Sequence, residues 1–138
     1  MSGSFDCSIK LWDIETGVVC YRTFHHGIDG GISFVLGLAL VNSSHFVSVS
    51  LDNTAKVWNL SNNEDCLYTF KDHTKTVHDA VFLPEEKVVV TASGDKTVRR
   101  WSIDHFLIEE EISEEGSTRS VSVITTEEGT KMHNVTEC

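Results

Sequence analysis

Three short windows of the chain repeat one alternation of apolar and polar positions. Residues 2–13 read SGSFDCSIKLWD, residues 48–59 read SVSLDNTAKVWN and residues 91–102 read TASGDKTVRRWS. In each window, small or apolar residues alternate with polar ones on both sides of an Asp. A period of two is typical of strands, and the short Asp side chain suits a tight turn because it accepts hydrogen bonds from nearby backbone N–H groups. Each window therefore predicts a strand, a turn and a second strand.

The windows recur at a nearly constant spacing. Trp12, Trp58 and Trp101 lie 46 and 43 residues apart, and each follows an Asp by six positions. A Ser stands two residues before each Asp, a hydroxyl residue two after it and a base four after it. Apolar segments follow each Trp and precede the second and third windows, so each unit is expected to hold four strands. The segments after the Trp residues are 18–24, 66–70 and 106–112.

A period of about 43 residues, four strands in each unit and a Trp closing the third strand resemble the WD-repeat family, and Trp12-Asp13 shows its signature dipeptide. The resemblance implies an all-β fold: a WD-repeat β-propeller segment with about three blades' worth of four-stranded antiparallel sheets, as two full blades and two half blades. The expected parts are the end of a first blade (1–24), a second blade (25–70), a third blade (71–112) and the start of a further blade (113–138).

The number of blades predicts an incomplete propeller. Propellers close with about 4 to 8 blades, and Met1 falls inside a predicted strand, so we expect a segment of a larger propeller. The sheets at the two ends of such an arc would leave apolar surface uncovered. Self-association through these uncovered blade edges is therefore expected.

In the family, a His before the first strand, a Ser in the second, the turn Asp and the Trp join in one hydrogen-bond network. The second unit has Gly31 where the His is expected, so this blade is either looser or takes His26 from its longer loop. We expect Trp101→Ala to destabilise by about 3–5 kcal/mol, and more than Trp58→Ala. The residues that the resemblance assigns to the network are His73, Ser93, Asp95 and Trp101 in the third unit, Ser50, Asp52 and Trp58 in the second, and Ser4, Asp6 and Trp12 in the first.

A set of Ser, His and Asp does not by itself indicate a hydrolase. A nucleophilic Ser must be exposed beside an oxyanion site, whereas Ser93 is expected to bond to a Trp within a sheet. We predict no enzymatic activity, no catalytic residue and no cofactor. A metal site built from His25, His26 and Cys20 is also not favoured, because no fourth ligand is indicated and Cys20 recurs as Cys66 at the same repeat position.

Composition narrows the class of partner. The 138 residues are 40% hydrophobic, and no run approaches the roughly 18 consecutive apolar residues of a membrane span. The net charge of −10 disfavours nucleic acid, whose binding depends on Lys and Arg. The first residues lack a secretory signal, and the four cysteines are scattered singly, so we expect free thiols and a cytoplasmic or nuclear location.

The resemblance implies a non-catalytic scaffold or adaptor that binds other proteins. One alternative is the substrate-recognition subunit of a ubiquitin ligase complex, and another is an RNA-associated propeller subunit. Cullin-linked receptors of the family often carry Arg two residues after the Trp-Asp pair. This chain has Glu15, Ser61 and Asp104 there, which favours the scaffold.

Family members bind partners on the face that carries the tight turns and the starts of the first strands. Phe5 and Leu51 are the candidate anchors, since an apolar residue at a turn tip is often used in interfaces, although packing against the adjacent blade is the alternative. The candidate partner-binding face comprises Phe5, Leu51, Gly94, Phe34, Leu36, Thr76 and His78.

Overall fold

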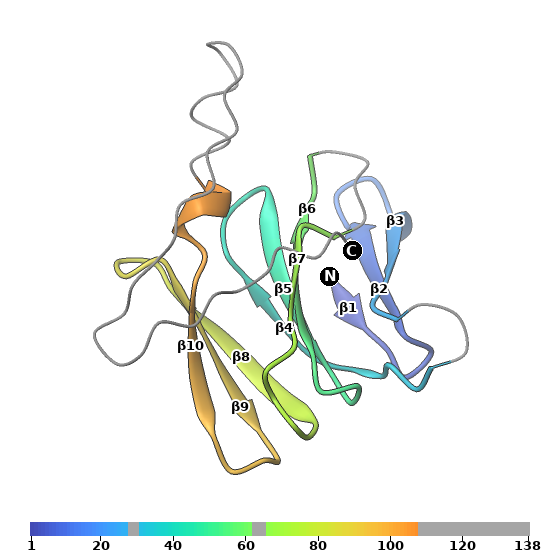
Figure 1. Ribbon diagram of the computed structural model, residues 1–138. Coiled ribbons are helices and arrows are strands. Elements are labelled where there is room, and N and C mark those ends of the chain that lie inside the picture. Colours follow the sequence, from blue (N-terminus) through green and yellow to red (C-terminus); the bar gives the residue numbers. More distant parts are fainter. Residues whose placement is uncertain (28–30, 62–65, 108–138) are drawn as a thin grey trace.

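The computed structural model describes residues 1–27, 31–61 and 66–107, and these residues form strands in three antiparallel sheets (Figure 1). The first sheet has the order β1-β2-β3, the middle sheet β4-β5-β6-β7 and the third sheet β10-β9-β8. The strands are β1 (Ser2–Gly3), β2 (Ser8–Asp13), β3 (Val19–His25), β4 (Val35–Leu40), β5 (His45–Ser50), β6 (Ala55–Asn59), β7 (Tyr68–Phe70), β8 (Val77–Leu83), β9 (Val88–Ser93) and β10 (Val98–Ser102).

The three sheets follow one another along the chain and lie side by side, with β4 and β8 adjacent to each other at the middle of the arrangement (Figure 1). Each sheet is a meander in which consecutive strands pair. This is the arrangement of propeller blades, and the expectation of an all-β WD-repeat propeller segment is confirmed.

Only the first two residues of the strand expected over 106–112 are described. An apolar strand was predicted over 106–112, but residues 104–107 form a helical turn in which Phe106 N–H donates to the Ile103 carbonyl at 3.0 Å. The apolar side chains of Phe106 and Leu107 pack against the core from this turn, so they bury apolar surface without a strand. The remainder of that segment, and the predicted further blade at 113–138, lie outside the described residues.

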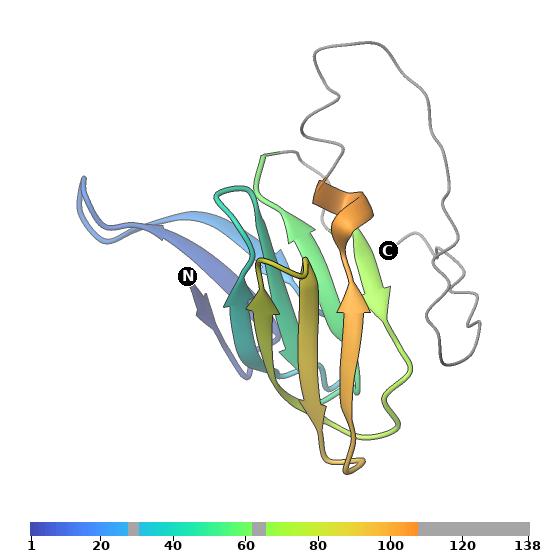
Figure 2. The same ribbon diagram turned by 90° about the vertical axis from the view of Figure 1, so that its left-hand side faces the viewer.

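The middle sheet is covered on both faces, and every residue of β5 is buried. Side chains alternate between the faces of a strand, so Phe46 and Trp58 pack against the first sheet while Val47 and Val57 pack against the third. In Figure 2 the strands of the third sheet lie in front of those of the middle sheet. Each fully buried side chain of this size contributes about 1.5–3 kcal/mol, so the two sheet-to-sheet contacts hold the arrangement together.

None of the described helical residues forms a segment long and apolar enough to cross a bilayer. The cysteines agree only in part with the expectation of free thiols. Cys7 and Cys20 are free, whereas Cys66 is disulfide-bonded, so the expectation is wrong for Cys66.

Candidate functional site: the hydrogen-bond network and the turn face

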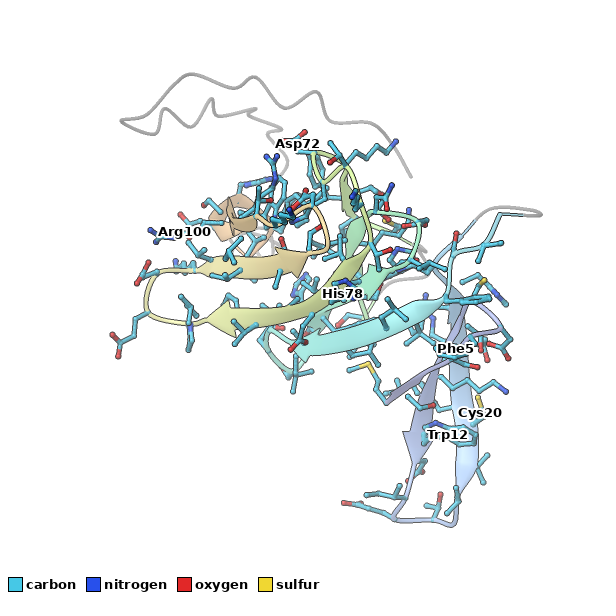
Figure 3. All side chains as sticks on the ribbon, turned by 90° about the horizontal axis from the view of Figure 1, so that it is seen from below. Phe5, Trp12, Cys20, Asp72, His78 and Arg100 are labelled. Carbon is cyan, nitrogen blue, oxygen red and sulfur yellow. The ribbon has the colours of Figure 1, made fainter. Side chains whose placement is uncertain are left out.

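The tight turns between the second and third strands of each repeat have one geometry. The residue after the turn Asp has a positive φ in all three: 68° at Cys7, 73° at Asn53 and 69° at Lys96. A turn ending in a left-handed residue matches the right-handed twist of a hairpin and fixes its register. The three turns therefore project the same positions onto one face of the molecule, which Figure 3 views.

The repeated Ser and Asp build this turn. In the third repeat, Ser93 Oγ accepts from Asp95 N–H at 3.1 Å, and Asp95 Oδ1 accepts from the N–H and hydroxyl of Thr97 at 2.8 and 2.6 Å. The same contacts recur in the other repeats, from Ser4, Asp6 and Ser8 and from Ser50, Asp52 and Thr54. The spacing of Ser, Asp and Ser or Thr is thus explained by local hydrogen bonds that satisfy the turn.

The third repeat holds a continuous network between its turn and its Trp. His73 Nδ1 lies 2.8 Å from Asp95 Oδ2, and His73 Nε2 lies 2.7 Å from Thr91 Oγ1. Trp101 Nε1–H donates to the same Thr91 oxygen at 2.8 Å. His73, Asp95 and Trp101 therefore take the places that the sequence assigned to them.

The hydroxyl partner of the Trp was assigned to the wrong residue. The acceptors are Ser2 for Trp12, Ser48 for Trp58 and Thr91 for Trp101, and each stands two positions before the predicted Ser. The register explains the difference. Trp101 pairs with Val89, so Thr91 is its diagonal neighbour on the same face, within reach of a long side chain, and Ser93 is two residues farther. The signal was present, since residues 2, 48 and 91 are all hydroxyl residues.

His26 completes the network of the middle sheet, as one of the two alternatives for this repeat predicted. Its Nδ1 lies 2.6 Å from Ser48 Oγ and its Nε2 lies 2.9 Å from Thr54 Oγ1, while Asp52 Oδ1 is 3.7 Å from Nε2. Trp58 Nε1–H donates to Ser48 at 2.7 Å. The His26 side chain has no exposed surface, so this repeat is as closed as the third despite its different loop.

The network changes the ionisation of its members. Burial lowers the pKa of His26 below its usual 6.5. Burial raises the pKa of Asp52, but hydrogen bonds with His26 and Thr54 more than offset this and leave that pKa well below its usual value. Hydrogen bonds from Thr97 and then from His73 likewise lower the pKa of Asp95. Both carboxylates are therefore held in the charged form by their partners.

The first sheet has a simpler arrangement. Trp12 is half-buried and donates only to Ser2, at 2.8 Å. By contrast, Trp58 packs on Phe24 with ring centroids 5.6 Å apart, and Trp101 stacks on Phe70 at 4.6 Å. Phe24 is the second-last residue of β3 and Phe70 the last residue of β7, so each aromatic partner lies at the end region of the last strand of the preceding sheet.

The Ser, His and Asp of the third repeat do not form a nucleophile beside a base. Ser93 donates its hydroxyl to the Lys75 carbonyl at 2.9 Å, and His73 contacts Thr91 and Asp95 instead. A nucleophilic Ser needs the base within hydrogen-bond reach, so this arrangement is structural.

The histidines and cysteine considered as metal ligands are drawn into other contacts. His26 is buried in the network, His25 is exposed at the preceding position of the chain, and Cys20 Sγ lies 3.5 Å from Thr23 Oγ1. Among the residues that the structure describes, no three His, Cys, Asp or Glu side chains gather as a ligand set.

Two neighbouring arginines of β10 are paired with carboxylates. Arg99 lies 3.9 Å from Asp72, and Arg100, whose side chain is 64% exposed, is paired with Glu86. Arg100 therefore keeps its charge in water at a position where the other repeats carry Leu11 and Val57, and its charge is balanced locally.

The candidate face is built where the first and middle sheets meet. Phe5 is 69% exposed and stacks on Phe34 with ring centroids 5.1 Å apart and planes 20° apart. Leu51 N–H donates to the Phe34 carbonyl at 3.0 Å, and Leu51 is 37% exposed. Of the other predicted face residues, His78 is exposed, whereas Leu36, Thr76 and Gly94 are partly buried. Three loops thus place apolar side chains in one exposed group, and Figure 3 shows Phe5 beside the start of β4.

Two exposed residues of this face were not among the predicted ones. Lys75 precedes β8 and Lys96 lies in the β9–β10 turn, and both are exposed. The sequence contains a signal for both, because Lys75 occupies the repeat position of Ser33 and Lys96 that of Asn53.

Comparison with known proteins agrees with the blade geometry. The family model described as "WD domain, G-beta repeat" matches residues 18–59 and 64–102. The chain is 28% identical over 101 residues to WD repeat and SOCS box-containing protein 1 of Danio rerio, covering 72% of this chain and 23% of that protein. It is 31% identical over 105 residues to nuclear distribution protein nudF 1 of Talaromyces marneffei, covering 74% and 22%.

A third relative gives the same picture. Nuclear distribution protein PAC1 of Arthroderma benhamiae is 34% identical over 107 residues, covering 74% of this chain and 23% of that protein. The chain therefore spans less than a quarter of the length of these relatives. The chain belongs to the WD40 family of WD-domain, G-beta repeat proteins.

Proposed function

We propose that this protein is a non-catalytic scaffold or adaptor that binds partner proteins through the turn face defined by Phe5, Phe34, Leu36, Leu51, Thr76, His78 and Gly94. The observation that carries the proposal is the exposed Phe5 stacked on Phe34 next to Leu51. A large aromatic side chain at a turn tip exposes apolar surface to water, which is unfavourable, and it contributes little to the core. In interfaces, such residues are the usual anchors.

Exposure alone does not single out this face. Tyr21 is 76% exposed and Ile14 is 78% exposed elsewhere on the first sheet. The turn face differs because its apolar residues come from separate loops of two sheets and converge. A contact surface assembled from several loops on a rigid scaffold is a common arrangement for binding sites.

The ubiquitin-ligase receptor and the RNA-associated subunit are less well supported. Glu15, Ser61 and Asp104 stand where Cullin-linked receptors often carry Arg, and the arginines of β10 are paired with carboxylates. Binding of RNA through phosphates needs cations that are free to displace counterions.

The test is a quantitative pull-down from cells with the full-length protein. Partners recovered by the wild type should be lost from the Phe5→Ala/Leu51→Ala variant and retained by Tyr21→Ala, which removes an equally exposed aromatic ring from β3. Partner recovery that is unchanged in the double variant, or reduced equally in the Tyr21 control, would rule out the turn face as the binding surface.

A further inference from the structure

Two neighbouring repeats present different chemistry at the same positions of the turn face. The register of the first strand shifts between Val35 and Gly37 in β4 and between Val77 and Asp79 in β8. The extra residue at such a bulge is re-aimed by the local kink, and here it is Leu36 in the middle sheet and His78 in the third. The repeat geometry is therefore kept while the side chain changes from apolar to imidazole.

The turn tip changes together with the bulge. Phe5 and Leu51 occupy the tips of the first two turns, but Gly94 occupies the third. A Cβ at residue 94 would stand 3.2 Å from His78 Nε2 and 3.8 Å from Lys75 Cβ. The imidazole of His78 thus lies over the glycine, in the place beside the turn tip that an apolar side chain at residue 94 would need.

Two exposed lysines stand in the chain segments next to residue 94, Lys75 before β8 and Lys96 in the β9–β10 turn. Lys75 stands where the middle repeat has the buried Ser33, and Lys96 stands at the positive-φ position that Asn53 takes in the middle repeat. The carboxylate of the same turn, Asp95, is engaged by His73 and Thr97. Asp79, the residue after His78 in β8, is exposed, and its Oδ1 accepts from the Ala80 N–H at 2.9 Å.

We infer that the turn face has an apolar half, made of Phe5, Phe34, Leu36 and Leu51, and a basic half, made of Lys75, His78 and Lys96, and that it binds an acidic segment of a partner protein. An apolar side chain of that segment would pack on the Phe5–Phe34 pair, and Asp or Glu residues beside it would meet the two lysines. This inference rests on the proposed function and adds the chemistry of the partner.

Carboxylates are favoured over phosphates because the basic half contains no arginine. The guanidinium of Arg binds phosphate through paired, planar donors, whereas Lys offers a single point charge that serves a carboxylate equally well. Complementary charge at an exposed site sets which partner binds and how fast it associates.

The experiment selects short peptides from a random displayed library on the full-length protein and measures the enriched peptides by fluorescence anisotropy. We expect enriched peptides to carry Asp or Glu next to an apolar residue. Their affinity should fall about fivefold in the Lys75→Glu/Lys96→Glu variant, which should in turn prefer the same peptides with Lys in place of Asp and Glu. Lys87→Glu, a single charge reversal in the turn at the opposite end of β9, should change affinity by less than about twofold.

The outcomes separate the two proposals. Peptides that need Phe5 and Leu51 but show no acidic preference and no charge swap would overturn the basic half and leave the proposed function standing. Peptides whose affinity changes neither in the Phe5→Ala/Leu51→Ala variant nor in the Lys75→Glu/Lys96→Glu variant would overturn both the proposed function and the basic half. The same conclusion would follow if selection on the wild type gave no enrichment over selection on the Phe5→Ala/Leu51→Ala variant. If replacing Asp or Glu of a peptide with phosphoserine raises its affinity by about tenfold or more, the basic half binds phosphate rather than carboxylate.

Discussion

Replacing His26 with alanine would remove a ring that links the turn of the middle sheet to its Trp. The imidazole contacts Ser48 at 2.6 Å and Thr54 at 2.9 Å, and each such hydrogen bond contributes about 1 kcal/mol net. The substitution would also leave a small cavity and strip buried hydroxyls of a partner, which costs about another 1–2 kcal/mol. We therefore expect His26→Ala to lower the free energy of unfolding by about 2–4 kcal/mol.

His25 supplies a matched control, because it is the same residue type one position earlier and it is exposed. His25→Ala should change the free energy of unfolding by less than about 0.5 kcal/mol. Urea denaturation followed by tryptophan fluorescence measures both variants, with an unchanged m-value as the check that only stability differs. Equal losses from the two variants, or a loss below about 1 kcal/mol for His26→Ala, would refute the assignment of His26 to the network.

Three further predictions follow from the same contacts. Burial lowers the pKa of His26, so at low pH the unfolded chain binds a proton at this residue that the folded chain does not. The free energy of unfolding should therefore be unaffected by His26 above a pH of about 6.5 and fall as the pH drops below it. Urea titrations at several pH values should show a shallower fall in His26→Ala. Trp58→Ala should cost about 3–5 kcal/mol in denaturant titrations and Trp12→Ala clearly less, since Trp58 is 1% exposed and Trp12 is half-buried; similar losses would contradict the packing described. Ser48→Ala should cost more than Ser50→Ala by about 1–2 kcal/mol, because Ser48 serves both Trp58 and His26; the reverse order would restore the sequence-based assignment.

The order of the two buried tryptophans needs revision in the light of His26. The sequence predicted that Trp101→Ala would be more damaging than Trp58→Ala, because no His aligned with the second repeat. The structure gives Trp58 a network through Ser48 and His26, and Trp58 also contacts Phe24 and Phe46. We now expect losses of similar size from the two substitutions.

Periodicity was enough to predict the strands and the tight turns, because both depend on local rules. Alternation predicted β5 and β6, and the spacing of Ser50, Asp52 and Thr54 reflects the hydrogen bonds that these three residues make with one another within the turn. These features need no knowledge of which sheet lies next to which. The expectation of a strand over 106–112 is not met at its two described residues, Phe106 and Leu107, which reach the core from a helical turn, because an apolar run alone does not specify a strand.

Contacts between strands were harder to predict because they depend on register. Choosing Ser93 over Thr91 as the partner of Trp101 is an error of one diagonal step, and only the pairing of Trp101 with Val89 resolves it. His26 is a similar case. It enters the network from a position that does not align with His73, so the outcome depended on the path of the loop and not on the repeat.

The backbone conformation of the turns is the same in the repeats of this chain, whereas the side chains on the turns differ. The φ values at Asn53 and Lys96 are 73° and 69°, so the two turns share a backbone while one carries an amide and the other a charge. Asn tolerates a left-handed conformation well and Lys less so, and a charged side chain is not needed to form it. The charge of Lys96 is therefore not required by the fold, and the same holds for the exchange of Leu36 for His78 at the bulge. Positions where the side chain varies and the backbone stays constant can therefore determine which partner binds without disturbing the hydrogen-bond network of His, Asp and Trp.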